Sequence, residues 1–270
     1  MVQNAVKLSL LIPAYNEEPT VAPALDRILA VAWPYPVELV FVDDRSADNS
    51  LNILREWLHA NQGALTSKNM VAKVLQHSEN RGKGAAIQAA ISAADGEILI
   101  VQDADEEYVP AEVPSLVQPI LEERADVVYG SRFKKNVNQA HRTYHYLINR
   151  FLTMLSNLAS GLYVTDMETC YKAFRADILK NLRLESKRFG FEPEVTAHIA
   201  RLKARIWELP ISYYPRTHLQ GKKITWKDGV AALRHIFYFN FWVQDRFLPH
   251  MPTRYLMAPL EKKNTLAPSL

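Results

Sequence analysis

The segment EILIVQDAD, residues 97–105, decides the fold because an apolar run ends in closely spaced carboxylates. The apolar residues 98–101 are too few for a helix and are typical of a strand buried on both faces. The sequence then turns polar at once, with Asp103 and Asp105 two positions apart. In parallel α/β sheets, ligands bind beyond the carboxyl ends of the strands. The segment therefore predicts a buried strand that ends at a binding site.

The same pattern occurs three more times upstream. Apolar runs at 8–12, 37–42 and 70–75 predict strands, the first stopped by Pro13. Helical spacing predicts helices over 20–30, from 46 to about 59, and over 83–94. This alternation predicts a doubly wound, mostly parallel α/β sheet flanked by helices. The polar loops that begin at Pro13, Asp43, His77 and Asp103 should then converge on one edge of the sheet.

The rest of the chain is less regular. We expect strands at 127–129, 171–174 and 205–214 and a helix over 192–201, whereas the mixed polar residues 134–141 predict a loop. A helix over 142–162 should place its apolar residues on one face: Leu147, Phe151, Met154, Leu155 and Leu158.

Composition limits the classes of protein that fit. With 270 residues, 48% of them hydrophobic, the chain can bury the core of one large domain. The net charge of +3 is too small to indicate a nucleic-acid partner, but it is unevenly spread. Residues 1–200 carry 20 Lys and Arg against 25 Asp and Glu, whereas residues 201–270 carry 12 against 4. We therefore divide the chain into a nucleotide-binding domain, residues 1–216, and a basic, aromatic-rich helical extension, residues 217–270.

Other features exclude further classes. The single cysteine, Cys170, allows no intramolecular disulfide and favours a reducing, cytoplasmic setting. No secretory signal is visible, and the apolar window at 236–243 is far shorter than the roughly 18 residues of a membrane-spanning helix. The histidines lack metal-ligand spacing and no Gly-x-Ser-x-Gly motif occurs, so zinc and serine hydrolases have no support.

The strongest chemical signal is the acidic group Asp103, Asp105 and Glu107. Hard cations such as Mg²⁺ and Mn²⁺ prefer oxygen ligands, and carboxylates just beyond a buried strand can face one point. Diphosphate oxygens would complete such a site. The alternative is a solvated acidic turn, which the position at a strand end makes less favoured.

Other motifs leave alternatives open. Residues 43–46, Asp-Asp-Arg-Ser, could hydrogen-bond a nucleoside or simply cap the next helix, and residues 13–17, Pro-Ala-Tyr-Asn-Glu, could stack a base or form an ordinary turn. Residues 80–84, Asn-Arg-Gly-Lys-Gly, could bind phosphate or start a helix, but they lack P-loop spacing, which disfavours an ATPase. Arg132 could pair with phosphate, as could Arg216, Lys222 and Lys223, or these cations could be solvated.

Taken together and in order, these motifs resemble family-two glycosyltransferases of the GT-A fold, especially dolichyl- and polyprenyl-phosphate sugar synthases. The similarity runs from about residue 7 to 229 and includes IPAYNE (12–17), VDDRS (42–46), NRGKG (80–84), QDAD (102–105), GSR (130–132), Asp166 with CYK (170–172), and FGFE (189–192). The resemblance implies that the nucleotide sugar is held by Pro13, Tyr15, Glu17, Asp44, Lys83, Asp103, Arg216 and Lys222, and the metal by Asp103, Asp105 and Glu107. Many relatives have Gln at the position of Glu107.

The resemblance also implies the chemistry. Mg²⁺ or Mn²⁺ would neutralise the leaving nucleoside diphosphate of a UDP- or GDP-sugar, with Asp105, Asp166 and Arg132 as catalytic residues of an inverting hexosyl transfer. A lipid-phosphate acceptor is already anionic near pH 7 and needs no strong base. A soluble or polysaccharide hydroxyl acceptor would need one, and Asp166 or Glu168 would then be the candidate.

The aromatic residues of the extension suit an anionic bilayer surface, so we expect peripheral attachment to the cytoplasmic membrane face; packing on the domain or across a dimer is the alternative. These residues are Trp226, Phe237, Tyr238, Phe239, Phe241 and Trp242, near Arg234 and Arg246. Two rivals for the function remain. One is a nucleotide-binding regulatory protein without turnover, which the acidic group disfavours, and the other is a nucleotidylyltransferase, which would need a Gly-rich basic motif after the first strand. The sequence does not indicate the oligomeric state.

Overall fold

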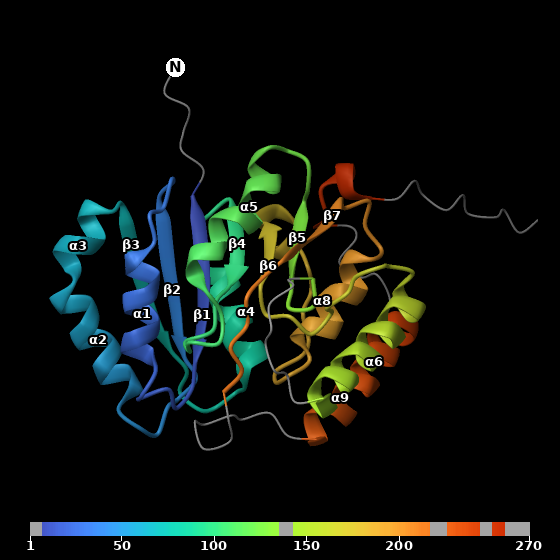
Figure 1. Cartoon of the computed structure of the whole chain (residues 1–270), viewed down its shortest axis with the longest axis horizontal. Coiled ribbons are helices and arrows are strands. Elements are labelled where there is room, and N and C mark those ends of the chain that lie inside the picture. The colour runs from blue at the N-terminus through green and yellow to red at the C-terminus, as the bar shows by residue number, and fades with distance from the viewer. Residues whose placement is uncertain (1–6, 135–142, 217–225, 244–249, 257–270) are drawn as a thin grey trace, which may run out of the picture.

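A seven-stranded sheet forms the centre of the molecule, and helices cover both of its faces (Figure 1). The computed structural model describes residues 7–134, 143–216, 226–243 and 250–256, and for residues 143–145 and 226–228 the backbone alone. The strands are β1 (Leu8–Ala14), β2 (Val37–Asp43), β3 (Met70–Gln76), β4 (Ile98–Val101), β5 (Val127–Ser131), β6 (Lys172–Arg175) and β7 (Ile206–Pro210). The helices are α1 (Val21–Ala30), α2 (Ser50–Ala60), α3 (Gln62–Ser67), α4 (Lys83–Ala93), α5 (Val113–Leu121), α6 (Thr143–Ser160), α7 (Ala176–Leu179), α8 (Phe191–Ile199) and α9 (Trp226–Phe237).

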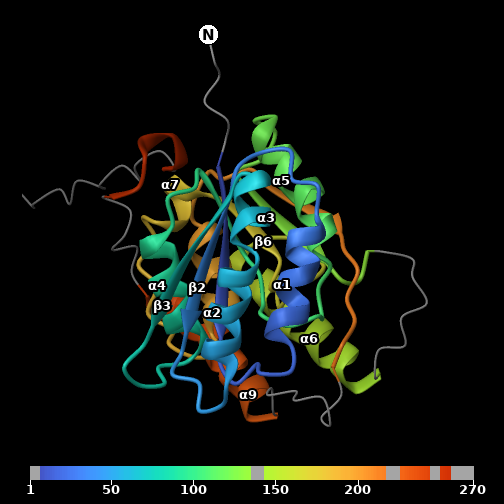
Figure 2. The ribbon, with the colours of Figure 1, turned by 90° about the vertical axis from the view of Figure 1, so that its left-hand side faces the viewer.

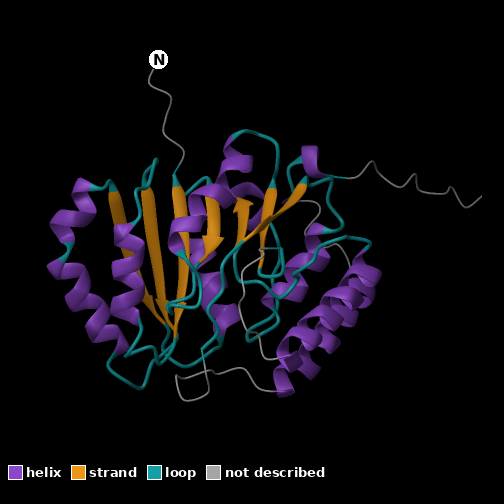
Figure 3. Cartoon of the chain, in the orientation of Figure 1, coloured by secondary structure: helices purple, strands orange, loops and turns teal. Residues whose placement is uncertain are grey.

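The strand order is β3-β2-β1-β4-β6-β5-β7, and only β6 runs antiparallel to its neighbours (Figure 3). This order confirms the predicted doubly wound, mostly parallel sheet. The antiparallel β6 sits between β4 and β5, so the loops that precede β6 and follow β4 and β5 all reach the same edge of the sheet.

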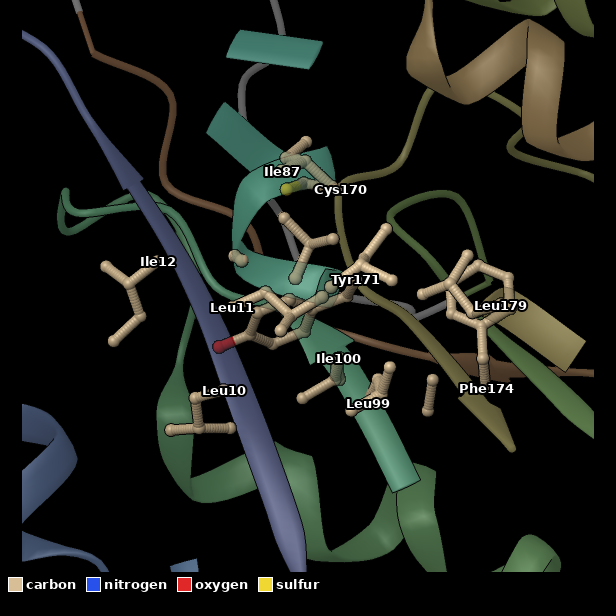
Figure 4. Packing of buried hydrophobic residues seen from close by; sticks show 14 of the residues in the cluster. Leu10, Leu11, Ile12, Ile87, Leu99, Ile100, Cys170, Tyr171, Phe174 and Leu179 are labelled. Atoms are coloured by element: carbon tan, nitrogen blue, oxygen red, sulfur yellow. The ribbon is translucent and has the colours of Figure 1, made fainter. Parts of the chain in front are cut away.

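The core is densest around β1, β2 and β4, whose residues are all buried. Strands covered on both faces favour apolar residues at most positions, which explains the apolar runs in the sequence; Ser9 and Glu38, the polar residues within these runs, are buried and bonded to each other. Figure 2 shows α4 on one side of β2 and α1 on the other. Figure 4 shows Leu11, Leu99 and Phe174, from β1, β4 and β6, whose side chains lie on the same face of the sheet and belong to the core.

Several predicted boundaries differ from the structure. Pro13 does not stop the first strand, because β1 continues to Ala14 and Pro13 pairs with Val42 of β2. A proline is tolerated there because β4, the other neighbour of β1, pairs only as far as Leu11. The segment after β2 forms two helices, α2 and α3, and β7 ends at Pro210 rather than at residue 214.

Helix α6 has the predicted length but an unexpected orientation. The apolar side chains Leu147, Phe151, Met154 and Leu158 are exposed, whereas the polar side chains Thr153 and Ser156 are buried. The polar face is turned inward because it holds the backbone of the following loop: the hydroxyl of Thr153 accepts a hydrogen bond from the amide of Met167 at 3.1 Å. The side chain of Asn157 bonds both the amide and the carbonyl of Val164.

Helix α9, which begins the described part of the expected C-terminal extension, packs on the rest of the domain. Helix α9 contacts α6 and α8 and continues into a π-helical turn, η3 (Tyr238–Trp242). Of its aromatic side chains, Phe239 is buried, whereas Phe237, Tyr238, Phe241 and Trp242 are exposed; the side chain of Trp226 and all of Arg246 lie outside the described residues. Among the described helices, none combines the length and apolarity needed to cross a bilayer. The division of the chain at residue 217 stays a prediction.

Candidate active site

The loops that follow β1 and β2 are locked together by short polar contacts. Asn16 adopts a positive φ of 50°, its amide donates to the hydroxyl of Ser46 at 2.9 Å, and its side-chain oxygen accepts from the amide of Ala47 at 2.8 Å. The amide of Glu17 donates to the hydroxyl of Ser50 at 2.7 Å. Asparagine tolerates this left-handed conformation better than most residues. These contacts fix the position from which the carboxylate of Glu17 enters the site.

Asp44 is buried and already has three partners. Its carboxylate accepts hydrogen bonds from the amides of Arg81 and Gly82 at 2.9 and 2.6 Å, and it lies 2.6 Å from Nδ1 of His77. In this conformation Asp44 holds the loop after β3 in place. The contact of Asp44 with a nucleoside stays a prediction, and a nucleoside would compete with these partners for the carboxylate.

The glycines of residues 80–84 allow two backbones to approach closely. Gly82 has a φ of +93°, and a Cβ added there would lie 2.4 Å from the carbonyl oxygen of Lys187. The amides of Gly84 and Ala85 donate to the carbonyls of Arg188 and Lys187 at 3.1 and 3.0 Å. Because these first helical amides are already bonded, the structure favours packing over phosphate binding as the reason for the glycines.

Lys83, the first residue of α4, points to the acidic loop after β4. Its ammonium lies 2.7 Å from the carboxylate of Asp103 and 3.6 Å from the sulfur of Cys170. Figure 4 shows Cys170 beside Ile87 of the same helix. The sequence placed Lys83 and Asp103 at one site, and the structure brings them into direct contact.

Arg216 joins the remaining acidic residues. Its guanidinium lies 2.7 Å from Asp105 and 2.8 Å from Glu17, and its backbone amide donates to the carboxylate of Glu107 at 2.7 Å. The hydroxyl of Tyr213 donates to the same carboxylate at 3.0 Å. Segments from the two ends of the chain therefore meet at one cluster. We call Glu17, Asp103, Asp105 and Glu107, with Lys83 and Arg216, the acidic cluster.

The acidic cluster carries an excess of negative charge. Burial, followed by the charges of Asp103 and Glu107, raises the pKa of Asp105 to about 7, although Arg216 acts in the opposite direction. Burial also acts to raise the pKa of Asp103, but the ammonium of Lys83 outweighs it and the pKa is lowered. Four carboxylates thus share two protein cations.

The cluster fits a divalent cation in its chemistry, although it is not a finished cage. No group of three or more His, Cys, Asp or Glu side chains in the described part of the chain is arranged to hold a metal ion unaided. The donors are nevertheless all carboxylate oxygens, which suit Mg²⁺ and Mn²⁺, and the excess negative charge would be relieved by a cation. The set suits a metal whose coordination is completed by a diphosphate.

Arg132 and Asp166 form a second unit, in which Asp166 is buried and Arg132 is partly buried. Two nitrogens of the guanidinium lie 2.7 Å from the two oxygens of Asp166, and the amide of Arg132 donates to the same carboxylate at 3.0 Å. The guanidinium also lies over the ring of Tyr213, 5.0 Å from its centre. Glu208 holds the loop by accepting from the amide of Asp166 at 3.0 Å. Tyr213 thus connects this pair to the acidic cluster.

Three residues in or beside the site were not assigned a role from the sequence: Tyr213, Glu208 and Lys172. Tyr213 and Glu208 belong to the segment 205–214, in which only a strand was expected. Lys172 was quoted as part of CYK without a role, and its fully buried ammonium donates to the carbonyls of Met167, at 2.9 Å, and Thr169. The local sequence carries no signal for these contacts, because their partners are distant or are backbone atoms.

The remaining predicted residues are less informative. Tyr15 is exposed at the carboxyl end of β1, where an aromatic ring could stack on a base, and Pro13 is buried within the strand. Lys222 and Lys223 lie outside the described residues. The site therefore contains Glu17, Asp103, Asp105, Glu107, Lys83 and Arg216 in contact, with Arg132 and Asp166 beside them.

Solved structures with this architecture define the class. The structure of TarS from S. aureus in complex with UDP aligns over 88% of this chain and 67% of its own, with a TM-score of 0.56 and 21% identity. The structure of glucosyl-3-phosphoglycerate synthase from Mycobacterium tuberculosis with UDP aligns over 87% of this chain and 80% of its own, with a TM-score of 0.61 and 20% identity. The fold is that of the GT-A glycosyltransferases.

The sequence comparisons then identify the family. The model of "Glycosyl transferase family 2" matches residues 9–183, and the chain belongs to this family. It is 28% identical over 221 residues to the dodecaprenyl-phosphate galacturonate synthase of Rhizobium johnstonii, covering 79% of this chain and 61% of that protein. It is 27% identical over 240 residues to the dolichol-phosphate mannosyltransferase of Pyrococcus furiosus, covering 88% and 64%. The chain matches somewhat over three fifths of the length of these two relatives.

Proposed function

We propose that the chain catalyses metal-dependent, inverting transfer of a hexose from a UDP- or GDP-sugar to a polyprenyl phosphate, such as dolichyl or undecaprenyl phosphate. The observation that carries the proposal is the convergence of four carboxylates, from the loops after β1 and β4, with the cationic Lys83 and Arg216. The relatives named for transfer to dodecaprenyl and dolichol phosphate support the choice of acceptor.

In this proposal Asp103, Asp105 and Glu107 hold Mg²⁺ or Mn²⁺, which neutralises the charge that develops on the leaving nucleoside diphosphate. Tyr15 offers a ring to the base, and Glu17 and Asp44 position the loops around the nucleoside. Lys83 and Arg216 supply positive charge toward the diphosphate. Because Arg216 now holds Asp105 and Glu17, it would exchange these partners for phosphate oxygens when the donor binds.

The pairing of Asp166 makes it a poor general base, which leaves Glu168 as the candidate base if the acceptor is a hydroxyl. A general base needs a free lone pair directed at the acceptor proton, but both oxygens of Asp166 are held by Arg132. A lipid phosphate is already anionic near pH 7 and requires no base. Asp166 then orients Arg132, whose guanidinium stabilises the approaching phosphate.

Nucleoside diphosphate release tests the proposal directly. The protein is incubated with Mn²⁺ or Mg²⁺ and a panel of UDP- and GDP-sugars, with polyprenyl phosphate, with a soluble glycan, or without acceptor. We expect release that requires both the metal and the lipid. Release with the glycan alone would establish the hydroxyl acceptor instead, and metal and nucleotide binding without any release would indicate a regulatory protein.

The variant Asp166→Asn tests whether Asp166 is the base for a hydroxyl acceptor, a role for which Glu168 is the other candidate. If Asp166 were the base for a hydroxyl acceptor, its loss would lower kcat by about 100-fold or more. For the lipid-phosphate acceptor we expect a smaller loss, about 10-fold, because only the orientation of Arg132 is weakened. The variant Ser92→Ala, which removes an exposed hydroxyl bonded within α4, is a control for nonspecific effects.

We also propose that the protein attaches to the cytoplasmic face of a membrane through α6, α9 and η3. The exposed apolar side chains of α6 and the exposed aromatics of η3 lie on helices that pack together, and Arg150 and Arg234 on the same helices are exposed. Aromatic and basic residues together suit an anionic lipid surface. The alternatives for the aromatics are packing on the domain, which accounts for Phe239 but not for the exposed Phe237, Tyr238, Phe241 and Trp242, and packing across a dimer.

Vesicle co-sedimentation tests the attachment. We expect binding to vesicles with anionic lipids, weakened by salt, and reduced in the double variant Phe241→Ser/Trp242→Ser. The variant Val71→Ser is the matched control, because Val71 is also exposed but lies on the edge strand β3. Equal binding by the double variant and the Val71→Ser control would contradict the proposal. So would a lack of binding by the unmodified chain at every salt concentration.

A further inference from the structure

One carboxylate beside the site is buried without a partner. Glu168 lies on the loop between α6 and β6, and its Oε1 is buried with no hydrogen bond within the described structure. The residue as a whole is only partly buried. Asp166, two residues earlier, is fully paired with Arg132. An unsatisfied buried carboxylate oxygen is costly, so it indicates a partner that binds there.

Glu192 at the start of α8 belongs to the same group. It is 9% exposed, and its charge acts on the pKa of Glu168, Lys172 and Lys83, which places it among all three. Lys172 is the cation nearest to the pair, but its ammonium donates to the carbonyls of Met167 and Thr169. Lys172 therefore does not satisfy the buried Oε1 of Glu168, which keeps hydrogen-bond acceptor capacity that the described residues do not use.

The position of this pair relates it to the donor. Lys83 connects Asp103 to Cys170, which is two residues from Glu168 on the same loop. On the other side, the charges of Arg132 and Asp166 also act on Glu168. The pair thus lies between the residues proposed to face the diphosphate and those proposed to face the acceptor. In a glycosyl transfer, the group between the diphosphate and the acceptor is the sugar itself.

We propose that Glu168 and Glu192 form the recognition subsite for the transferred sugar and accept hydrogen bonds from its hydroxyl groups, an inference that rests on the proposed function. Neutral sugars supply such donors, and carboxylate acceptors form stronger hydrogen bonds with hydroxyls than neutral acceptors do. A sugar that carries its own carboxylate is repelled. The subsite therefore selects neutral donor sugars over uronates.

The test compares the binding of nucleotides with and without the sugar, so that it does not depend on turnover. Affinities for UDP, GDP and their glucose, mannose and glucuronate derivatives are measured calorimetrically with Mn²⁺ for the unmodified chain, Glu168→Gln and Glu192→Gln. We expect each variant to bind the free nucleotide within about 2-fold of the unmodified chain. Each should lose on the order of 10-fold in affinity for the neutral sugar nucleotide and should discriminate less against the uronate.

Two outcomes would be read differently. If no nucleotide binds the unmodified chain, the proposed function fails. If nucleotides bind but both variants keep the affinity and selectivity for sugar nucleotides, the proposed function stands and the subsite is wrong. Glu38→Gln is the matched control, because Glu38 is also a buried glutamate but lies at the opposite end of the sheet. Thermal unfolding of every variant identifies any that do not fold, and either of the two variants suffices for the test.

Discussion

Two glutamates at opposite ends of the sheet are in very different environments. Glu38, at the amino end of β2, accepts hydrogen bonds from the hydroxyl of Ser9 and the amide of Asp95, and its carboxylate lies 2.8 Å from the ammonium of Lys73. Although burial opposes it, these partners lower the pKa of Glu38 to about 2. Glu168, at the carboxyl end, has an unpaired buried oxygen, and burial followed by the charge of Glu192 raises its pKa to about 7.

The comparison distinguishes charges that stabilise the fold from charges kept for a ligand. At the amino end the buried carboxylate of Glu38 is held by the ammonium groups of Lys7 and Lys73, a hydroxyl and a backbone amide. At the carboxyl end carboxylates outnumber the cations available to them, which costs stability and is typical of functional sites. A buried glutamate therefore stabilises the fold at the amino end, whereas at the carboxyl end it is available to a ligand.

The largest effect should come from the acidic cluster. We expect Asp105→Asn to lower the transfer rate by about 100-fold or more, because the metal that would hold the donor diphosphate loses a carboxylate ligand. Glu38→Gln should leave the rate unchanged. Steady-state measurement of nucleoside diphosphate release checks both variants, and a similar loss in the two would remove the distinction between the ends.

A smaller effect is expected on stability at the amino end. Glu38→Gln should lower the free energy of unfolding at pH 7 by about 1–3 kcal/mol, because Lys73 loses its charged partner. The pKa of Glu38 is lowered on folding, so its contribution is present above pH 4.5 and is lost as the pH falls toward 2. Urea unfolding should show the two proteins converging in stability over that range. A constant difference would mean that the charge of Glu38 is not involved.

At the carboxyl end we expect the replacement of a glutamate to raise, not lower, the free energy of unfolding. The pKa of Glu168 is raised on folding, so its contribution is present below pH 4.5 and is lost as the pH rises through about 7. Glutamine cannot ionise, so Glu168→Gln should have a higher free energy of unfolding than the unmodified chain at pH 8. This difference should become smaller at acidic pH. Urea unfolding at pH 5 and pH 8 measures the sign. A destabilised variant at pH 8 would show that Glu168 is satisfied after all.

The smallest effect is expected on the outer face of α6. Leu158→Asp should change the free energy of unfolding by less than about 0.5 kcal/mol, because this leucine is exposed. Leu25→Asp, on the buried face of α1, is the matched control and should destabilise by about 3 kcal/mol or more. Similar losses in the two variants would mean that part of the chain covers α6.

The sequence was most informative where neighbours along the chain decide the structure. Mostly apolar runs identified β1, β2 and β4, because a strand covered on both faces favours apolar residues at most positions. The carboxylates after β4 were placed correctly at the edge of the sheet. The continuation of β1 through Pro13 was missed, because it depends on how far β4 extends alongside.

Long-range contacts were the least predictable. The sequence grouped Arg216 with the donor site, but nothing local indicates that it bonds Glu17 and Asp105, residues 199 and 111 positions away. For α6, periodicity identified the apolar face but not its direction, since the inner face is decided by the loop that Thr153 and Asn157 hold. The lack of a partner for Glu168 is equally invisible without coordinates.

The inverted helix α6 has a consequence for how the site can be perturbed. Asn157 is bonded to the backbone of Val164, before Asp166, and Thr153 to the backbone of Met167, directly after it, so α6 is tied on both sides to the loop that carries Asp166. A substitution or label that shifts α6 would therefore shift the loop that carries Asp166. Substitutions there belong in any survey of turnover, even though they touch no substrate.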